Sequence, residues 1–279
     1  MLARDSWAHW GLAGGATVLF LGFCMFLASD GSAAPRDLLL AGLFTATIGI
    51  VLLLALQYIA EVTQGVWVRG GGVVMLIFYF IKLIGFSYNA ALDPENGFVL
   101  SFVGFTLGVG FCEEVCKLLP VLWRYWQPNH LSWRHAFLWG LASGAGFGIS
   151  EGITYSSEYY NGIHGPGIYV VRFLSCVALH AVWCGSAAIT LQRRQDLLHR
   201  DMNWYEIIIP VLAYVGVPMV LHGLYDTFLK KDMNAGALVM AILSFVYLAV
   251  QIYWLRGADD VEATEAMLHE YRRRKLASG

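Results

Sequence analysis

The sequence predicts an all-α membrane protein: a polytopic transmembrane helical bundle of about eight spans, followed by a short C-terminal cytoplasmic helix. Two observations predict this fold class. Hydrophobic residues make up 58% of the 279 residues and charged residues only 14%, whereas soluble domains contain about 45–50% apolar and about 25% charged residues. The apolar residues also stand in long runs, and a helix needs about 20 mostly apolar residues to cross a bilayer.

The composition excludes several other classes of protein. A net charge of −2 gives no basic surface for nucleic acid, so no nucleic-acid partner is expected. So apolar a chain is neither a water-soluble globule nor a disordered segment. The long runs contain Gly and Pro and do not resemble the ~10-residue alternating strands of an outer-membrane barrel. The expected surroundings are the lipid bilayer.

Eight runs are long enough to span it. They cover residues 7–28, 37–60, 71–90, 98–122, 135–156, 168–191, 206–229 and 235–255. The first run has no strong basic segment before it, so we interpret it as a span and not as a cleavable signal peptide. The second and third are predicted from length and apolarity alone, and the fourth can be extended to Trp126. The connections are short, so we expect one transmembrane domain, 1–255.

The fifth and sixth runs carry patterns of small residues. Gly140, Gly144 and Gly148 recur at four-residue spacing, which is typical of close helix–helix approach in lipid. In the sixth run, Cys176, His180 and Cys184 fall on one helix face, which we interpret as packing at a helix seam, with a metal site as the alternative. All five cysteines lie inside predicted spans, so we expect buried thiols and no disulfides.

The seventh and eighth runs complete the bundle, and the segment 256–279 remains as a cytoplasmic tail. Acidic residues begin this tail and a basic cluster ends it, an arrangement that suits a helix dipole. Positively charged residues in loops mark the cytoplasmic side of a membrane protein. With eight spans, the side that holds both termini has twelve Lys and Arg residues, and the opposite side has three, Arg36, Lys230 and Lys231. Both termini are therefore predicted to be cytoplasmic.

Ionisable side chains are concentrated in four consecutive runs, from the fourth to the seventh. They are Glu113, Glu114, Lys117, Glu151, His180, His222 and Asp226. Lys117 stands three and four residues after the two glutamates, and Asp226 stands four after His222, so each set can meet on its helix surface. Ionisable groups inside a membrane are expensive and are functional candidates by default. We therefore expect these residues to line one polar cavity.

The charges of this set do not balance. With ionised carboxyls and neutral histidines the set carries a net charge of −3, which a medium of low dielectric constant does not tolerate. Some carboxyls are then protonated, or the histidines are charged, or a cation binds. Lys117 is expected either to neutralise a glutamate or to contact substrate or water. Glutamate and histidine on separate helices are suitable ligands for a divalent metal and equally suitable for metal-free general acid–base catalysis.

Taken in order, these motifs resemble those of the PrsW family of intramembrane proteases. The resemblance is carried by Glu-Glu-x-x-Lys at 113–117, Phe-x-x-x-Glu at 147–151, His180 with Trp183, and His-x-x-x-Asp at 222–226, within a core of about 105–230. The related CAAX-processing and bacteriocin-processing proteases often have His in place of Glu151, Arg in place of Lys117 and Asn in place of Asp226. These differences favour the PrsW branch.

The resemblance implies a protease that cleaves membrane proteins in or near the bilayer of a bacterial inner membrane. A single-span substrate such as an anti-sigma factor of a stress response is the implied partner. Peptide hydrolysis needs a base, an oxyanion stabiliser and an acid.

We expect Glu113 to be the general base, with Glu114 as its partner or a second ligand. His222 with Asp226 would stabilise the oxyanion or transfer a proton. The remaining pair, His180 and Glu151, would act as a proton relay or as metal ligands.

Two questions stay open at this point. If a metal is bound, we expect zinc, held by a subset of Glu114, Glu151, His180 and His222. The alternative function is a proton- or cation-coupled transporter that uses the same buried residues. Three site residues, Glu151, His222 and Asp226, stand toward the non-cytoplasmic ends of their runs, which predicts a site in the outer half of the membrane.

Overall fold

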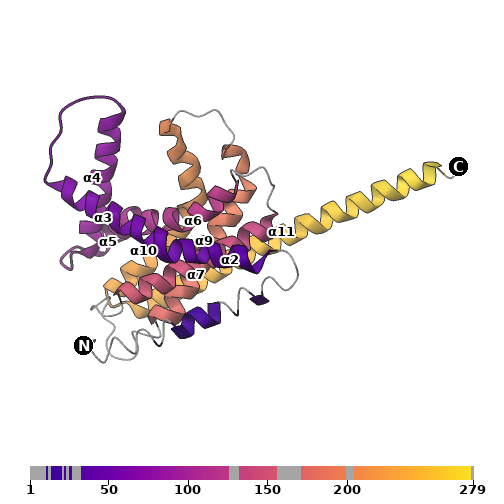
Figure 1. Ribbon diagram of the computed structural model, residues 1–279, viewed down its shortest axis with the longest axis horizontal. Coiled ribbons are helices and arrows are strands. Elements are labelled where there is room, and N and C mark those ends of the chain that lie inside the picture. Colours follow the sequence, from indigo (N-terminus) through magenta and orange to yellow (C-terminus); the bar gives the residue numbers. More distant parts are fainter. Residues whose placement is uncertain are drawn as a thin grey trace.

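A computed structural model describes residues 33–125, 132–155, 171–198 and 204–277, with scattered positions between 11 and 26 (Figure 1). Across these ranges the regular elements are helices and none is a strand, which confirms the all-α prediction. The first predicted span, 7–28, lies largely outside the described residues.

The helices follow the predicted runs closely. Their order is α2 (Pro35–Phe44), the π-helix η2 (Thr45–Gly49), α3 (Ile50–Gln64), α4 (Val73–Leu92), α5 (Phe98–Gly104), the π-helix η3 (Phe105–Gly110), α6 (Phe111–Tyr125), α7 (Trp133–Tyr155), the π-helix η4 (Val171–Cys176), α9 (Val177–Arg193), the 3-10 turns η5 (Gln195–Leu198) and η6 (Trp204–Ile207), α10 (Ile208–Lys230) and α11 (Asn234–Ala277). The three π-helices are inserted in, or lead directly into, longer helices.

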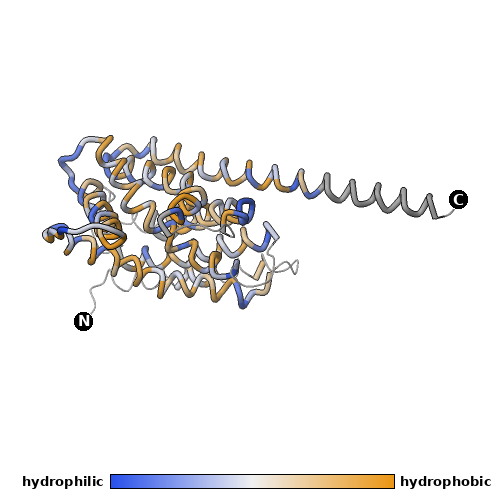
Figure 2. The backbone as a smooth tube through the Cα atoms, turned by 90° about the horizontal axis from the view of Figure 1, so that it is seen from above, coloured by the Kyte–Doolittle hydropathy of each residue, from blue (hydrophilic) through white to orange (hydrophobic). Residues whose placement is uncertain are grey.

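Six helical segments in the described ranges are long and apolar enough to cross a membrane. They are Pro35–Gln64, Val73–Leu92, Phe98–Tyr125, Leu174–Arg193, Ile208–Lys230 and Asn234–Asp259. They correspond to the second, third, fourth, sixth, seventh and eighth predicted runs, and apolar residues dominate along their course (Figure 2). The fourth run extends beyond residue 122, as far as Tyr125. Six spans are therefore supported, whereas the count of eight is not established.

Helix α7 occupies the fifth predicted run but is not among the six apolar segments. The lower hydropathy of α7 has a structural reason. This helix packs against α2, α6 and α9, and its residues 141–149 are all buried. A helix that is covered by protein does not need an apolar surface toward lipid. The predicted glycine face is confirmed: a Cβ added to Gly140 would lie 2.6 Å from the carbonyl oxygen of Cys184, and one added to Gly148 would lie 2.8 Å from Cα of Val177.

A second close approach joins η3 to α10. A Cβ added to Gly110 would lie 2.7 Å from the carbonyl oxygen of Met219, and one added to Gly223 would lie 2.7 Å from the backbone nitrogen of Thr106. Glycine therefore allows the two backbones to touch in both directions. The contact brings the start of α6 against the middle of α10, which is where the ionisable residues stand.

The last helix, α11, is 44 residues long and about 66 Å in length at ~1.5 Å per residue. It continues without a break across residue 255 and projects beyond the rest of the bundle (Figure 1). The division into a domain 1–255 and a cytoplasmic tail 256–279 stays a prediction. Near the end of the apolar segment, Trp133 Nε1 donates a hydrogen bond to Asp259 Oδ2 at 2.8 Å, which ties α11 to the start of α7.

Candidate active site

The first turns of α6 place a lysine between two glutamates. Lys117 Nζ lies 2.7 Å from Glu114 Oε1 and 3.3 Å from Glu113 Oε2, as the i,i+3 and i,i+4 spacing predicts. All three side chains are buried. The Lys117 backbone joins three helices, because its carbonyl oxygen accepts hydrogen bonds from Ser143 Oγ of α7 at 2.5 Å and from Cys184 Sγ of α9 at 3.4 Å.

His180 of α9 lies between Lys117 and Glu151. Its Nδ1 is 2.6 Å from Lys117 Nζ, and its Nε2 makes a short hydrogen bond with Glu151 Oε2 of α7. An ammonium group has only donors, so Nδ1 accepts from Lys117 and Nε2–H donates to Glu151. The close packing of α7 on α9 at the glycine face makes this contact across helices feasible.

His222 of α10 faces three carboxylates. Its Nδ1 lies 3.0 Å from Glu114 Oε1, and its Nε2 lies 3.4 Å from Asp226 Oδ2 and 3.7 Å from Glu113 Oε2. Asp226 is therefore close to His222 on the same helix, as the sequence predicts. The contacts connect all seven predicted site residues into one cluster built by α6, α7, α9 and α10.

Aromatic rings cover the two histidines. Trp183 stacks on His222 with ring centroids 4.3 Å apart and an interplanar angle of 19°, and Phe147 meets His180 edge-on at 5.5 Å. Trp183 is itself fixed, because its Nε1 donates a hydrogen bond to Ser244 Oγ of α11 at 2.9 Å. These rings restrict the orientation of both imidazoles and limit the access of water from their side.

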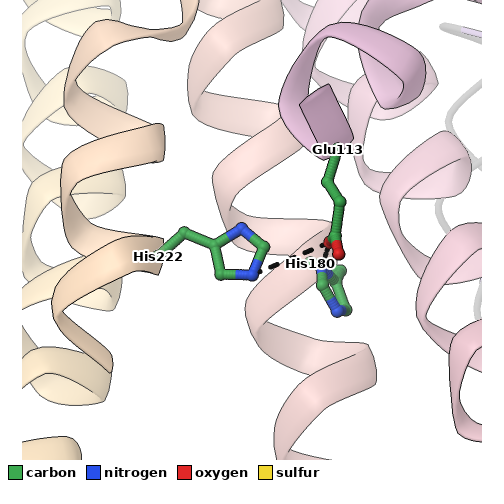
Figure 3. A group of neighbouring side chains, drawn as sticks. All are labelled: Glu113, His180 and His222. Carbon is green, nitrogen blue, oxygen red and sulfur yellow. Dashed lines mark ion pairs between the residues drawn. The ribbon is translucent and has the colours of Figure 1, made fainter. Parts of the chain in front are cut away.

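Three residues form a group that is geometrically able to hold a metal ion. One ligand atom each from Glu113, His180 and His222 lies within 4.8 Å of the others (Figure 3). Glu113 Oε2 is buried, pairs with Lys117 Nζ at 3.3 Å and makes no hydrogen bond in the described part of the chain, so this oxygen can still accept one. One carboxylate and two imidazoles are a common ligand set for zinc, and the donor set therefore fits a metal.

This group differs from the ligand set expected from the sequence. The histidines are the same, but Glu113 takes the place of the carboxylate, while Glu114 and Glu151 contact the remaining nitrogens, Nδ1 of His222 and Nε2 of His180. Carboxylates in such positions orient imidazoles and fix their tautomers. Neither Cys176 of η4 nor Cys184 of α9 belongs to this group, and no disulfide joins the described cysteines, Cys112, Cys116, Cys176 and Cys184. Cys24 lies outside the described residues.

The ammonium group of Lys117 lies next to two of the candidate metal ligands, Glu113 and His180. Its Nζ is 2.6 Å from His180 Nδ1 and 3.3 Å from Glu113 Oε2. A metal ion bound between Glu113 and His180 would therefore use acceptors that now face the lysine. With all four carboxyls ionised and both histidines neutral the cluster would carry a net charge of −3, so Lys117, which pairs with Glu113 and Glu114, offsets only part of the carboxylate charge.

A cavity of about 340 Å³ leads to the cluster, and seven of its nine lining residues were not predicted from the sequence. The wall consists of Gln57, Glu61, Gly85, Tyr88, Asn89, Leu92 and Val109, together with Glu113 and Glu151. The available signal was the presence of polar residues in otherwise apolar runs, since Gln57 lies inside 37–60 and Asn89 inside 71–90.

The fold and the site together define a class of protein. Several long apolar helices surround a buried centre of carboxylates, histidines and a lysine, so the chain is a polytopic integral membrane protein with an acid–base site between its helices. The sequence matches the PrsW family of intramembrane metalloproteases over residues 34–254, and the chain belongs to this family. No curated protein and no solved structure gives a significant match. The resemblance seen in the motifs is confirmed, and the protein is a membrane protease.

Proposed function

We propose that the cluster hydrolyses a peptide bond of a membrane-anchored substrate with a water molecule that Glu113 activates. The observation that carries this proposal is the position of Glu113 Oε2. This oxygen is buried, lacks a hydrogen-bond partner among the described residues and faces both histidines, and the Glu113 side chain also lines the cavity. A carboxylate in that position can accept a proton from a water that enters the cavity.

The other residues supply the remaining requirements of amide hydrolysis. His222 Nε2 lies between Glu113 and Asp226, where it can donate a hydrogen bond to the developing oxyanion or a proton to the leaving amine. Glu114 fixes the His222 ring through Nδ1, and Glu151 fixes His180 through Nε2. Lys117 holds both glutamates in place and offsets part of their charge.

If a metal takes part, Glu113, His180 and His222 would hold it. A bound zinc ion would polarise the scissile carbonyl and favour ionisation of a water. Lys117 would have to move away from Glu113 and His180 in that form, because the two cations share these acceptors. Glutamic-type and metallo-type hydrolysis therefore differ in the position of the Lys117 side chain.

The substrate we propose is a single-span membrane protein, of which an anti-sigma factor is the kind implied by the sequence resemblance. The proposed location is the bacterial inner membrane with both termini in the cytoplasm, as the distribution of Lys and Arg suggests. The family membership favours this protease over the transporter alternative.

The test is cleavage of a single-span reporter by the purified protein in liposomes. Wild type is compared with Glu113→Gln and His222→Ala, and Glu95→Gln and His135→Ala serve as matched controls outside the cluster. We expect cleavage by wild type and both controls and a loss of at least about 100-fold in the two site variants. Cleavage by either site variant at the wild-type rate would contradict the assigned role.

A further inference from the structure

The cavity beside the cluster has a polar wall of its own. Gln57 and Glu61 come from α3 and Asn89 comes from α4, while Glu113 and Glu151 form the end that belongs to the cluster. Its volume of about 340 Å³ lies at the lower end of the range of ligand sites, about 300–1,000 Å³. It therefore has room for a short stretch of chain that passes beside the catalytic carboxylate.

Two side-chain amides in this wall require a polar partner. Gln57 is half-buried, and Asn89 is exposed near the end of α4. Both stand in helices that are long and apolar enough to cross the membrane, and an amide without a hydrogen bond is costly in hydrocarbon. In the described ranges neither side-chain amide takes part in a hydrogen bond within the protein. Their partner is therefore water or a polar ligand that enters the cavity.

An unwound membrane segment is a ligand of this chemistry. In lipid, a helix satisfies all of its backbone N–H and C=O groups internally, and a peptide bond becomes open to attack only where the helix is broken. The groups released there need new partners, and they find them only inside protein or in a water-filled cavity. Each Gln or Asn amide offers both donors and acceptors, which complement the two kinds of backbone group.

We propose that the cavity binds the extended backbone of an unwound substrate segment next to the scissile bond, through the side-chain amides of Gln57 and Asn89. This inference rests on the proposed hydrolytic function and adds the element that recognises the substrate. The lining also contains three carboxyl groups, on Glu61, Glu113 and Glu151, and no Lys, Arg or His. The cavity therefore selects neutral or basic side chains near the scissile bond and disfavours acidic ones.

Binding and cleavage are measured separately to test the proposal. Two fluorescent membrane peptides of equal length are compared, one with a continuous Leu/Ala helix and one with a central Gly-Pro-Gly that unwinds it. Their affinity is determined in liposomes for the His222→Ala variant, whose substitution lies outside the cavity wall. Gln57→Leu, Asn89→Leu and the double substitution are added to this background, with Tyr58→Leu as the control because Tyr58 is 68% exposed on the same helix.

The His222→Ala protein should bind the unwound peptide more tightly than the continuous helix. Each amide contributes about fivefold in affinity at ordinary hydrogen-bond strength, so each single variant should lose about fivefold of this preference and the double variant roughly 25-fold. Tyr58→Leu should keep the preference. An unchanged preference in the double variant would overturn the proposal, and so would equal binding of the two peptides. If the double variant does not fold, the single variants decide.

A separate measurement distinguishes this proposal from the proposed function. Wild-type protein is incubated with the unwound peptide and cleavage is followed by mass spectrometry. If wild type cleaves the peptide but the Gln57 and Asn89 variants bind it as tightly as their parent, the proposed role of the cavity is overturned and the proposed hydrolysis stands. If these variants lose binding but wild type does not cleave the peptide, the role of the cavity is supported and the proposed hydrolysis is contradicted. An Asp introduced beside the Gly-Pro-Gly should weaken binding, whereas a Lys at the same position should not.

Discussion

Replacement of Lys117 by Met tests the electrostatic design of the site. The ammonium group contacts Glu114, Glu113 and His180, and the lysine side chain is completely buried. Met has a similar length but no charge, so the variant leaves two buried carboxyl groups without their cationic partner. Removing one partner of a buried ion pair typically costs about 3–5 kcal/mol. We expect Lys117→Met to lower the free energy of unfolding by about this amount.

The same variant also tests whether a divalent ion competes with the lysine. Without the ammonium group, Glu113 and His180 are free to bind a cation, so zinc should stabilise Lys117→Met more than wild type. Saturating a site at 100 times its dissociation constant contributes about 2.7 kcal/mol, which would restore a large part of the loss. The assay is thermal or denaturant unfolding of purified protein with and without zinc, with metal content measured in parallel.

The double variant Lys117→Met with Glu114→Gln is the control, because it removes one of the carboxylates together with the lysine. It should be more stable than Lys117→Met alone. A free energy of unfolding for Lys117→Met equal to that of wild type would contradict the role of Lys117 in neutralising the glutamates. Equal stabilisation of wild type and Lys117→Met by zinc would contradict the competition between zinc and the lysine.

Two further substitutions probe how the fold positions the site. Gly144→Ala places a methyl group against the backbone of α9, so it should lower the melting temperature and reduce the cleavage rate at least about tenfold. Gly216→Ala is the control, because a Cβ there would meet nothing within 4 Å, and it should change neither. A melting curve and a cleavage rate are measured for each variant. Trp183→Leu removes the ring that stacks on His222 and should lower kcat about tenfold with little change in KM, while Trp123→Leu, at a site 62% exposed, should leave both unchanged. A larger effect on KM than on kcat would contradict the positioning role of Trp183.

The fold was predictable to the extent that lipid imposes a composition on what it touches. Six predicted runs reappear as helices able to span a membrane, because their surfaces must be apolar. Helix α7 occupies a predicted run but is not among these six, because a helix enclosed by other helices is free to carry Gly, Ser and Glu151. The contact of α11 with the site, through Ser244 and Trp183, had no signal in the sequence, since a serine on a membrane helix is unremarkable by itself.

Which residues gather in the cluster was predictable for a different reason. Ionisable residues in apolar runs are rare, and the i,i+3 and i,i+4 spacing already implies that Glu114 contacts Lys117 and that Asp226 contacts His222. The pairing between helices depends on rotation and depth, which a linear pattern does not contain. For this reason the ligand set expected from the sequence contained Glu114 and Glu151 and not Glu113, whose Oε2 faces both histidines. The sequence also gave no role to Gln57 or Asn89 in the cavity.

The proposed mechanism has Glu113 direct a water molecule to the scissile carbonyl, and a single-turnover cleavage in ¹⁸O-water shows whether that oxygen enters the product. Enzyme in liposomes is mixed with a smaller amount of the single-span reporter, and the new carboxyl terminus is weighed by mass spectrometry. We predict one heavy oxygen in the product of the first turnover and no product from Glu113→Gln. A first-turnover product without heavy oxygen, or cleavage by Glu113→Gln at the wild-type rate, would contradict the mechanism.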